Sequence, residues 1–130
     1  MAVELDHTIV PSRHPVESAR LLGELLDVPW SASGIGPFSP VYVNDGLTLD
    51  FIGTDEDFPV YHFCFRVDEA RFDAILARLR ARSIAFRSNV RGPVDHRINT
   101  DYGGRMVYWN EPDGHQWEML TVSYARAPAA

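Results

Sequence analysis

The chain has 130 residues, which is enough for one domain with a single hydrophobic core. Hydrophobic residues make up 45% and charged residues 23% of it, as is normal for a globular protein. The formal net charge of −6, without any basic stripe, argues against nucleic-acid binding. All 12 positively charged residues are arginines, which excludes Schiff-base chemistry on lysine.

Cysteine content and hydrophobic patterning indicate in which compartment the protein is expected. Cys64 is the one cysteine, so the chain has no internal disulfide. The N-terminal residues lack the basic and apolar regions of a signal peptide, and no apolar stretch approaches the roughly 20 residues that span a bilayer. We therefore expect a soluble cytoplasmic protein with no membrane partner.

The first half of the chain predicts a strand, a helix and a hairpin. Alternation and β-branched residues predict a strand over Val3–Val10. Pro15 to Val28 carries apolar residues at helical spacing, and Pro15 is suited to a first helical turn. After a turn-rich connection, residues 41–43 and 47–52 predict a hairpin around the turn sequence Asn-Asp-Gly.

The second half repeats this order. Tyr61–Val67 is a strand by composition, and Asp68 is suited to cap a helix over Glu69–Arg82. Ile84–Phe86 begins another strand, and a polar loop from Ser88 to Gly104 follows. Two further strands, over residues 105–110 and 115–122, flank a tight turn at 111–114.

Strand, helix and short strands therefore occur twice, which predicts an α+β fold of two tandem βαβββ modules. Neither half can bury its own sheet face, so we expect one mixed, mostly antiparallel sheet curved around a cavity. Module one covers about residues 1–56 and module two about 57–125 of a single domain, before a short disordered tail from Arg126. A ferredoxin-like domain is the competing interpretation.

Three segments resemble the vicinal-oxygen-chelate superfamily, which includes glyoxalase I, fosfomycin-resistance enzymes, bleomycin-binding proteins and extradiol dioxygenases. The segment 5–10, Leu-Asp-His-Thr-Ile-Val, is similar to the opening strand of that fold. The segment 61–67, Tyr-His-Phe-Cys-Phe-Arg-Val, is similar to the first strand of its second module. The segment 111–120 resembles the family's Pro-Asp-Gly turn and the final strand that follows it.

The resemblance implies a metal site made by His7, His62 and Glu118. Strand alternation agrees with it, because His62 shares a face with Cys64 while Tyr61, Phe63 and Phe65 point the other way. Two imidazoles and one carboxylate with open positions suit one divalent cation, Fe(II), Mn(II), Ni(II) or Zn(II). In members of the fold that bind no metal, the same positions line an empty cleft.

Three further residues are candidates for catalysis. Asp50 matches the position at which the first module of the family carries a carboxylate, so the resemblance implies that it is a metal ligand or a residue that orients one. Tyr108 lies ten positions before Glu118, the spacing of an active-site tyrosine in the extradiol dioxygenases that the chain resembles. His96, in the long loop, could supply an acid or base. Each also has an ordinary structural interpretation as an exposed or packing side chain.

The expected function is that of a metal-dependent enzyme whose small-molecule substrate chelates the cation through adjacent oxygens. Extradiol-type dioxygenation and a glyoxalase-like lyase or isomerase reaction are both open. The alternative is a protein that sequesters an aromatic or hydrophobic compound, as bleomycin-resistance proteins do. Short members of the family pair two chains, which implies a homodimer.

Overall fold

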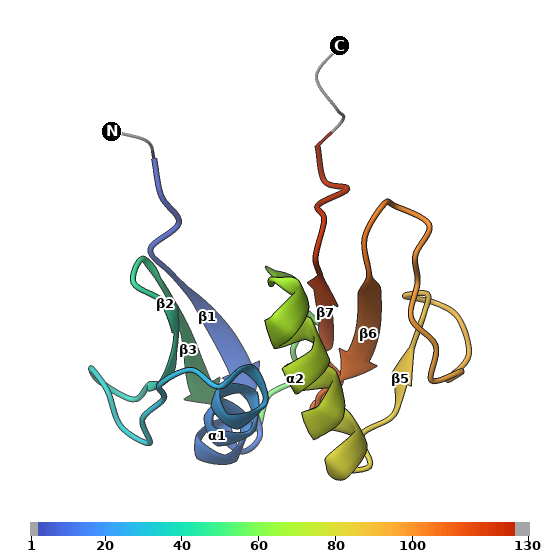
Figure 1. Cartoon of the computed structure of the whole chain (residues 1–130). Coiled ribbons are helices and arrows are strands. Elements are labelled where there is room, and N and C mark those ends of the chain that lie inside the picture. Colours follow the sequence, from blue (N-terminus) through green and yellow to red (C-terminus); the bar gives the residue numbers. More distant parts are fainter. Residues whose placement is uncertain (1–2, 127–130) are drawn as a thin grey trace. The chain divides into compact units, whose positions relative to one another are not determined.

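The computed structural model describes residues 3–126 and divides into two compact units, Met1–Pro59 and Val60–Ala130 (Figure 1). Each unit contains a mixed sheet and one helix. The predicted disordered tail lies outside the described residues from position 127 onward. Neither helix of the described chain is long and apolar enough to cross a membrane.

The first unit contains a three-stranded sheet and helix α1. Its elements are β1 (His7–Ser12), α1 (Pro15–Leu26), β2 (Ser39–Asn44) and β3 (Leu47–Gly53). The strand order is β1-β3-β2, with β1 parallel and β2 antiparallel to β3. The turn between β2 and β3 is closed by the side chain of Asn44, which accepts a hydrogen bond from the Gly46 N–H at 2.9 Å.

Helix α1 ends two residues before the predicted Val28. Asp27 adopts the left-handed conformation with φ of 55°, and the Val28 N–H donates to the Gly23 carbonyl, so the chain turns away from the helix axis. Gly23 is required by close packing, since a Cβ there would lie 2.7 Å from Trp30 Cδ1. Trp30 then forms a single bridge to Val41, where the module has a bridge rather than a full strand.

The second unit contains a four-stranded sheet and helix α2. Its elements are β4 (His62–Arg66), α2 (Glu69–Ala81), β5 (Phe86–Arg87), β6 (Met106–Asn110) and β7 (Gln116–Leu120). The strand order is β4-β7-β6-β5, in which β4 runs parallel to β7 and the other pairs are antiparallel. Figure 1 labels β7, β6 and β5 of this sheet. The strand β7, which carries Glu118, therefore lies between β4 and β6.

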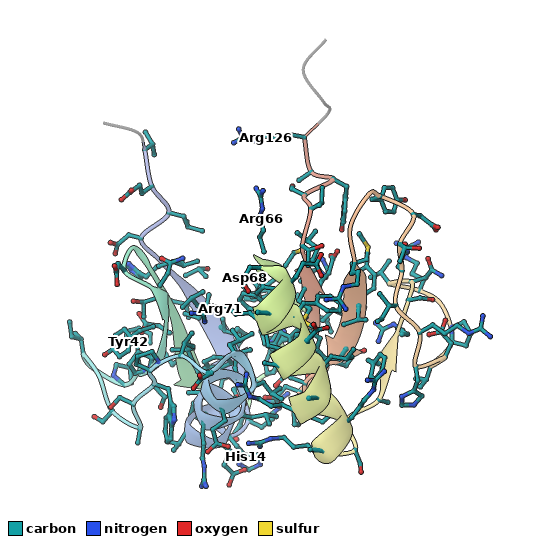
Figure 2. The ribbon with its side chains drawn as sticks, viewed as in Figure 1. His14, Tyr42, Arg66, Asp68, Arg71 and Arg126 are labelled. Atoms are coloured by element: carbon teal, nitrogen blue, oxygen red, sulfur yellow. The ribbon has the colours of Figure 1, made fainter. Side chains whose placement is uncertain are left out.

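Helix α2 begins where the sequence predicts. Asp68 caps it by accepting a hydrogen bond from the Arg71 N–H at 2.8 Å, at the helix end labelled by these two residues in Figure 2. Its buried side chains are Phe72, Ile75, Leu76 and Leu79.

Arg105, just before β6, ties the helix to the sheet. It forms an ion pair with Asp73 at 2.8 Å, and its guanidinium lies 4.3 Å from the centre of the Phe72 ring. These contacts hold α2 against the start of β6.

The predicted α+β fold of two tandem modules is confirmed. The described strands pair in two sheets rather than in the one expected sheet, and several element ends differ from the prediction. Strand β1 starts at His7 rather than Val3, because His7 is the first residue paired with β3, and it continues through Pro11. A proline is tolerated there because β1 is an edge strand. Strand β5 starts at Phe86 rather than Ile84, whose N–H instead closes the end of α2 on the Leu79 carbonyl.

Candidate functional site

A row of polar side chains crosses the sheet of the second unit. Cys64 on β4 and Tyr108 on β6 both lie opposite Glu118 on β7. Residues paired in this way point to the same face of a sheet. Their neighbours Phe65, Met119 and Val107 point to the opposite face and are buried in the core. The alternation that the sequence predicts thus separates a polar face from a packing face.

Glu118 is a fully buried carboxylate with defined hydrogen-bond partners. Its side chain is 0% exposed, and its Oε1 atom lies 3.1 Å from Nε2 of His62, whose side chain is 41% exposed. His62 pairs with Gln116, two residues before Glu118, so its ring reaches the carboxylate diagonally across the two strands. Burial of a carboxylate is costly unless hydrogen bonds compensate for lost water, and these contacts supply that compensation.

A second donor to Glu118 comes from beyond the end of β7. The Tyr124 hydroxyl lies 2.8 Å from both carboxylate oxygens of Glu118. The Tyr124 ring packs against Tyr102, with ring centroids 5.2 Å apart. The Tyr108 ring is also near, with its centroid 6.2 Å from that of the His62 ring. The Glu118 carboxylate therefore has His62, Tyr108, Tyr124 and Cys64 as its neighbours.

The electrostatics keep the neighbours of Glu118 protonated. Cys64 is an exposed residue, but partial burial of its thiol, followed by repulsion from the Glu118 charge, raises its pKa to about 12. Burial is also the largest cause that raises the pKa of Tyr108 and that of Tyr124, and Glu118 raises both further. At neutral pH these three side chains are therefore hydrogen-bond donors and not anions.

The first unit carries a histidine and a carboxylate in the same register. His7 pairs with Thr48, and Asp50 follows two residues later, as Glu118 follows Gln116 opposite His62. His7 is exposed and its Nδ1 lies 2.8 Å from Asp6 Oδ2. That hydrogen bond, with smaller contributions from the charges of Asp6 and Asp50, raises the pKa of His7. The two modules thus repeat one histidine–carboxylate arrangement.

His96 lies apart from this cluster. It has a left-handed backbone with φ of 53°, and its N–H donates to the Phe86 carbonyl at 3.1 Å. Its ring packs edge-on against Phe86 at 4.9 Å, and the Phe86 ring also faces Arg80 of α2. The contacts of His96 are therefore on the helix-covered face of the sheet, opposite to that of Glu118.

Sequence reasoning missed Tyr124 as a member of the cluster. It lies six residues after Glu118 and outside any strand, in a segment with no helical or strand periodicity. Tyr108 and His62 are predicted from the spacing and the motif of the family that the chain resembles, whereas the position of Tyr124 depends on how the chain returns after β7. The sequence offers one signal for Tyr124: an aromatic residue that comes shortly after a strand carrying a buried acid.

The donor types of the described residues suit a transition-metal ion. Imidazole and carboxylate groups are ligands for Fe, Mn, Ni and Zn, and in the second unit they already lie 3.1 Å apart. Among the described residues, no three His, Cys, Asp or Glu side chains lie together in positions to hold a metal.

Comparison with solved structures gives the family. The chain is 34% identical to oxidase ChaP-H2, with a TM-score of 0.90, over 96% of this chain and 98% of that chain. It is 39% identical to oxidase ChaP-H1, with a TM-score of 0.89, over 96% and 100% of the two chains. No protein-family model and no curated protein sequence matches it.

More distant structures share the fold alone. A glyoxalase/dioxygenase from Nostoc punctiforme is 22% identical, with a TM-score of 0.67 over 92% of this chain and 91% of that chain. Others of the same fold are a lactoylglutathione lyase and a fosfomycin-resistance protein. The chain belongs to the same family as the two ChaP-H oxidases, which it matches over nearly its whole length. Its fold is that of the vicinal-oxygen-chelate superfamily, as its motifs predict.

Proposed function

We propose that this protein is a metal-dependent oxidative enzyme that acts on a small molecule. In this proposal His62 and Glu118, with His7 from the first module, hold one divalent cation. The observation that carries the proposal is the buried Glu118 carboxylate with His62 Nε2 at 3.1 Å. An oxidation is favoured over a lyase or isomerase reaction because two relatives that match nearly the whole chain are oxidases.

The cation, when bound, would supply Lewis acidity and hold adjacent substrate oxygens. The protein's own side chains would orient the substrate and donate protons to it. Tyr108 keeps its proton because burial raises its pKa, so its hydroxyl can donate to a substrate oxygen. Cys64, with a pKa of about 12, stays a thiol at neutral pH and does not act as a nucleophile.

We assign different roles to Asp50 and His96. Asp50 occupies in the first module the strand position that Glu118 occupies in the second, so we assign it to the metal as a ligand or as a residue that orients one. Proton transfer is given to Tyr108 rather than His96, whose contacts are with Phe86. We also propose a homodimer with two equivalent sites, the assembly typical of short chains with this fold.

The alternative of a binding protein without chemistry is not favoured, because two relatives that match nearly the whole chain are named as oxidases and not as resistance proteins. If it were correct, the metal-free protein would bind an intact aromatic compound tightly, and added metal would produce no turnover.

Metal analysis tests the proposal. Protein purified without a metal-affinity tag should retain one Fe, Mn, Ni or Zn ion per chain, and His62→Ala and Glu118→Ala should each lose it. His96→Ala is the matched control and should retain it, because His96 contacts Phe86 on the other face of the sheet. Equal metal content in all four proteins, or none in the wild type, would refute the proposed site.

A further inference from the structure

The segment after β7 covers the buried carboxylate of the site. Tyr124 places its hydroxyl 2.8 Å from both Oε1 and Oε2 of Glu118, whereas His62 contacts Oε1 at 3.1 Å. Tyr124 is itself 42% exposed, while Glu118 is completely buried. A partly exposed side chain therefore bridges the two oxygens of the carboxylate on which the proposed site depends.

Bridging contacts restrict how a carboxylate can turn. A glutamate side chain ends in a broad torsion that packing alone defines poorly. One donor placed between two oxygens, together with a second donor on one of them, defines the plane of the group. The pair of contacts to Tyr124 and His62 thus holds Oε1 toward the imidazole.

Tyr124 is held in place from two sides. At the base of the segment, Thr121 exchanges two hydrogen bonds with Arg105: its N–H donates to the Arg105 carbonyl at 3.0 Å, and its Oγ1 accepts from the Arg105 N–H at 2.9 Å. Further along, the Tyr124 ring packs on Tyr102 at 5.2 Å. The hydroxyl is therefore presented to Glu118 by an anchored segment.

We propose that Tyr124 is a positioning residue that fixes the orientation of the Glu118 carboxylate toward His62. The effect on metal binding rests on the proposed function, in which Glu118 is a metal ligand. A ligand with a fixed orientation binds metal more tightly, and loss of such an outer hydrogen-bond partner typically weakens binding about 10- to 100-fold. The contact itself is present without metal, so its effect can be measured in the metal-free protein.

The first measurement uses metal-free protein and the side-chain ¹⁵N signals of His62. Tyr124→Phe removes only the hydroxyl, and the His62 signals should shift as its contact with Glu118 loosens. Tyr102→Phe is the matched control: it also removes one tyrosine hydroxyl, but Tyr102 contacts the Tyr124 ring rather than Glu118. His62 signals that are unchanged in Tyr124→Phe would overturn the proposal.

The second measurement is calorimetric titration of the same three proteins with Mn(II) and Co(II). Tyr124→Phe should bind about 10- to 100-fold more weakly than the wild type, and Tyr102→Phe should match the wild type. Unchanged or tighter binding by Tyr124→Phe would overturn the positioning role, since tighter binding means that the hydroxyl competes with metal. Absence of binding by the wild type would refute the proposed function, while the ¹⁵N signals would still decide the role of Tyr124.

A third measurement does not depend on a variant that folds. In a crystal structure of the metal-loaded wild type, the Tyr124 hydroxyl should remain within hydrogen-bond distance of a Glu118 oxygen. A Tyr124 side chain turned away from Glu118 in that structure would overturn the proposal.

Discussion

Although Cys64 is exposed, we predict that it reacts slowly with disulfide reagents, because the pKa of its thiol is raised. Its pKa is raised from an ordinary 9.0 to about 12 by burial and by the charge of Glu118. At about pH 8 the thiolate fraction is then roughly one in ten thousand, against roughly one in ten for the ordinary thiol. A thiolate of higher pKa is more nucleophilic, which offsets about 20- to 30-fold of this difference. The net expectation is a reaction on the order of 30-fold slower.

The assay is the rate of reaction of metal-free protein with an aromatic disulfide reagent, followed by absorbance as a function of pH. Cys64 is the only cysteine, so the signal has one source. The rate should rise with pH without reaching a plateau up to about pH 10, because the pKa lies above that range. A plateau near pH 9 would refute the reasoning, since a thiol that is slow only through steric hindrance still titrates normally.

Replacement of Glu118 by Gln separates the two causes of the raised pKa. Removal of the charge should lower the pKa of Cys64 but leave it above 9.0, because burial is the larger cause. The rate at about pH 8 should increase about threefold for each unit by which the pKa falls. Glu111→Gln, at a second buried glutamate in the turn before β7, is the matched control and should leave the rate unchanged.

Three further predictions concern stability and turnover. Asp68→Ala removes the cap of α2 and should lower the free energy of unfolding in urea by about 1 kcal/mol, whereas Asp45→Ala in an exposed turn should change it by less than about 0.5 kcal/mol. Phe72→Ala should cost about 3–5 kcal/mol in the same assay, because its ring is fully buried; a cost below about 1 kcal/mol would contradict the packing. Tyr108→Phe should lower kcat at least about 100-fold and leave metal content unchanged, and full activity would exclude its role as a proton donor.

Much of the fold was predictable from periodicity and turn chemistry. The two helices, the hairpin turn at Asn44 and the cap at Asp68 depend on residues close together in sequence. The ends of β1 and β5 were not predicted correctly, because they depend on pairing: His7 is the first residue of β1 paired with β3, and Ile84 is held by the last turn of α2.

The candidate site was likewise predictable only in part from the sequence. Strand alternation predicts that His62 and Cys64 share a face, and the family resemblance predicts that Glu118 lies with His62; the register of β4 and β7 places all three on one face. The hydroxyl of Tyr124 on Glu118 was not predicted, because it depends on the return of an irregular segment over the sheet. The packing of His96 on Phe86 likewise depends on the path of a long loop, which local sequence does not determine.

The most direct test of the central claim is an anomalous-scattering map of the wild-type protein crystallised after metal loading. The account predicts one peak per site, coordinated by His7, His62 and Glu118. A peak at another position, or His7 coordinating nothing while His62 and Glu118 remain bonded to each other, would contradict it.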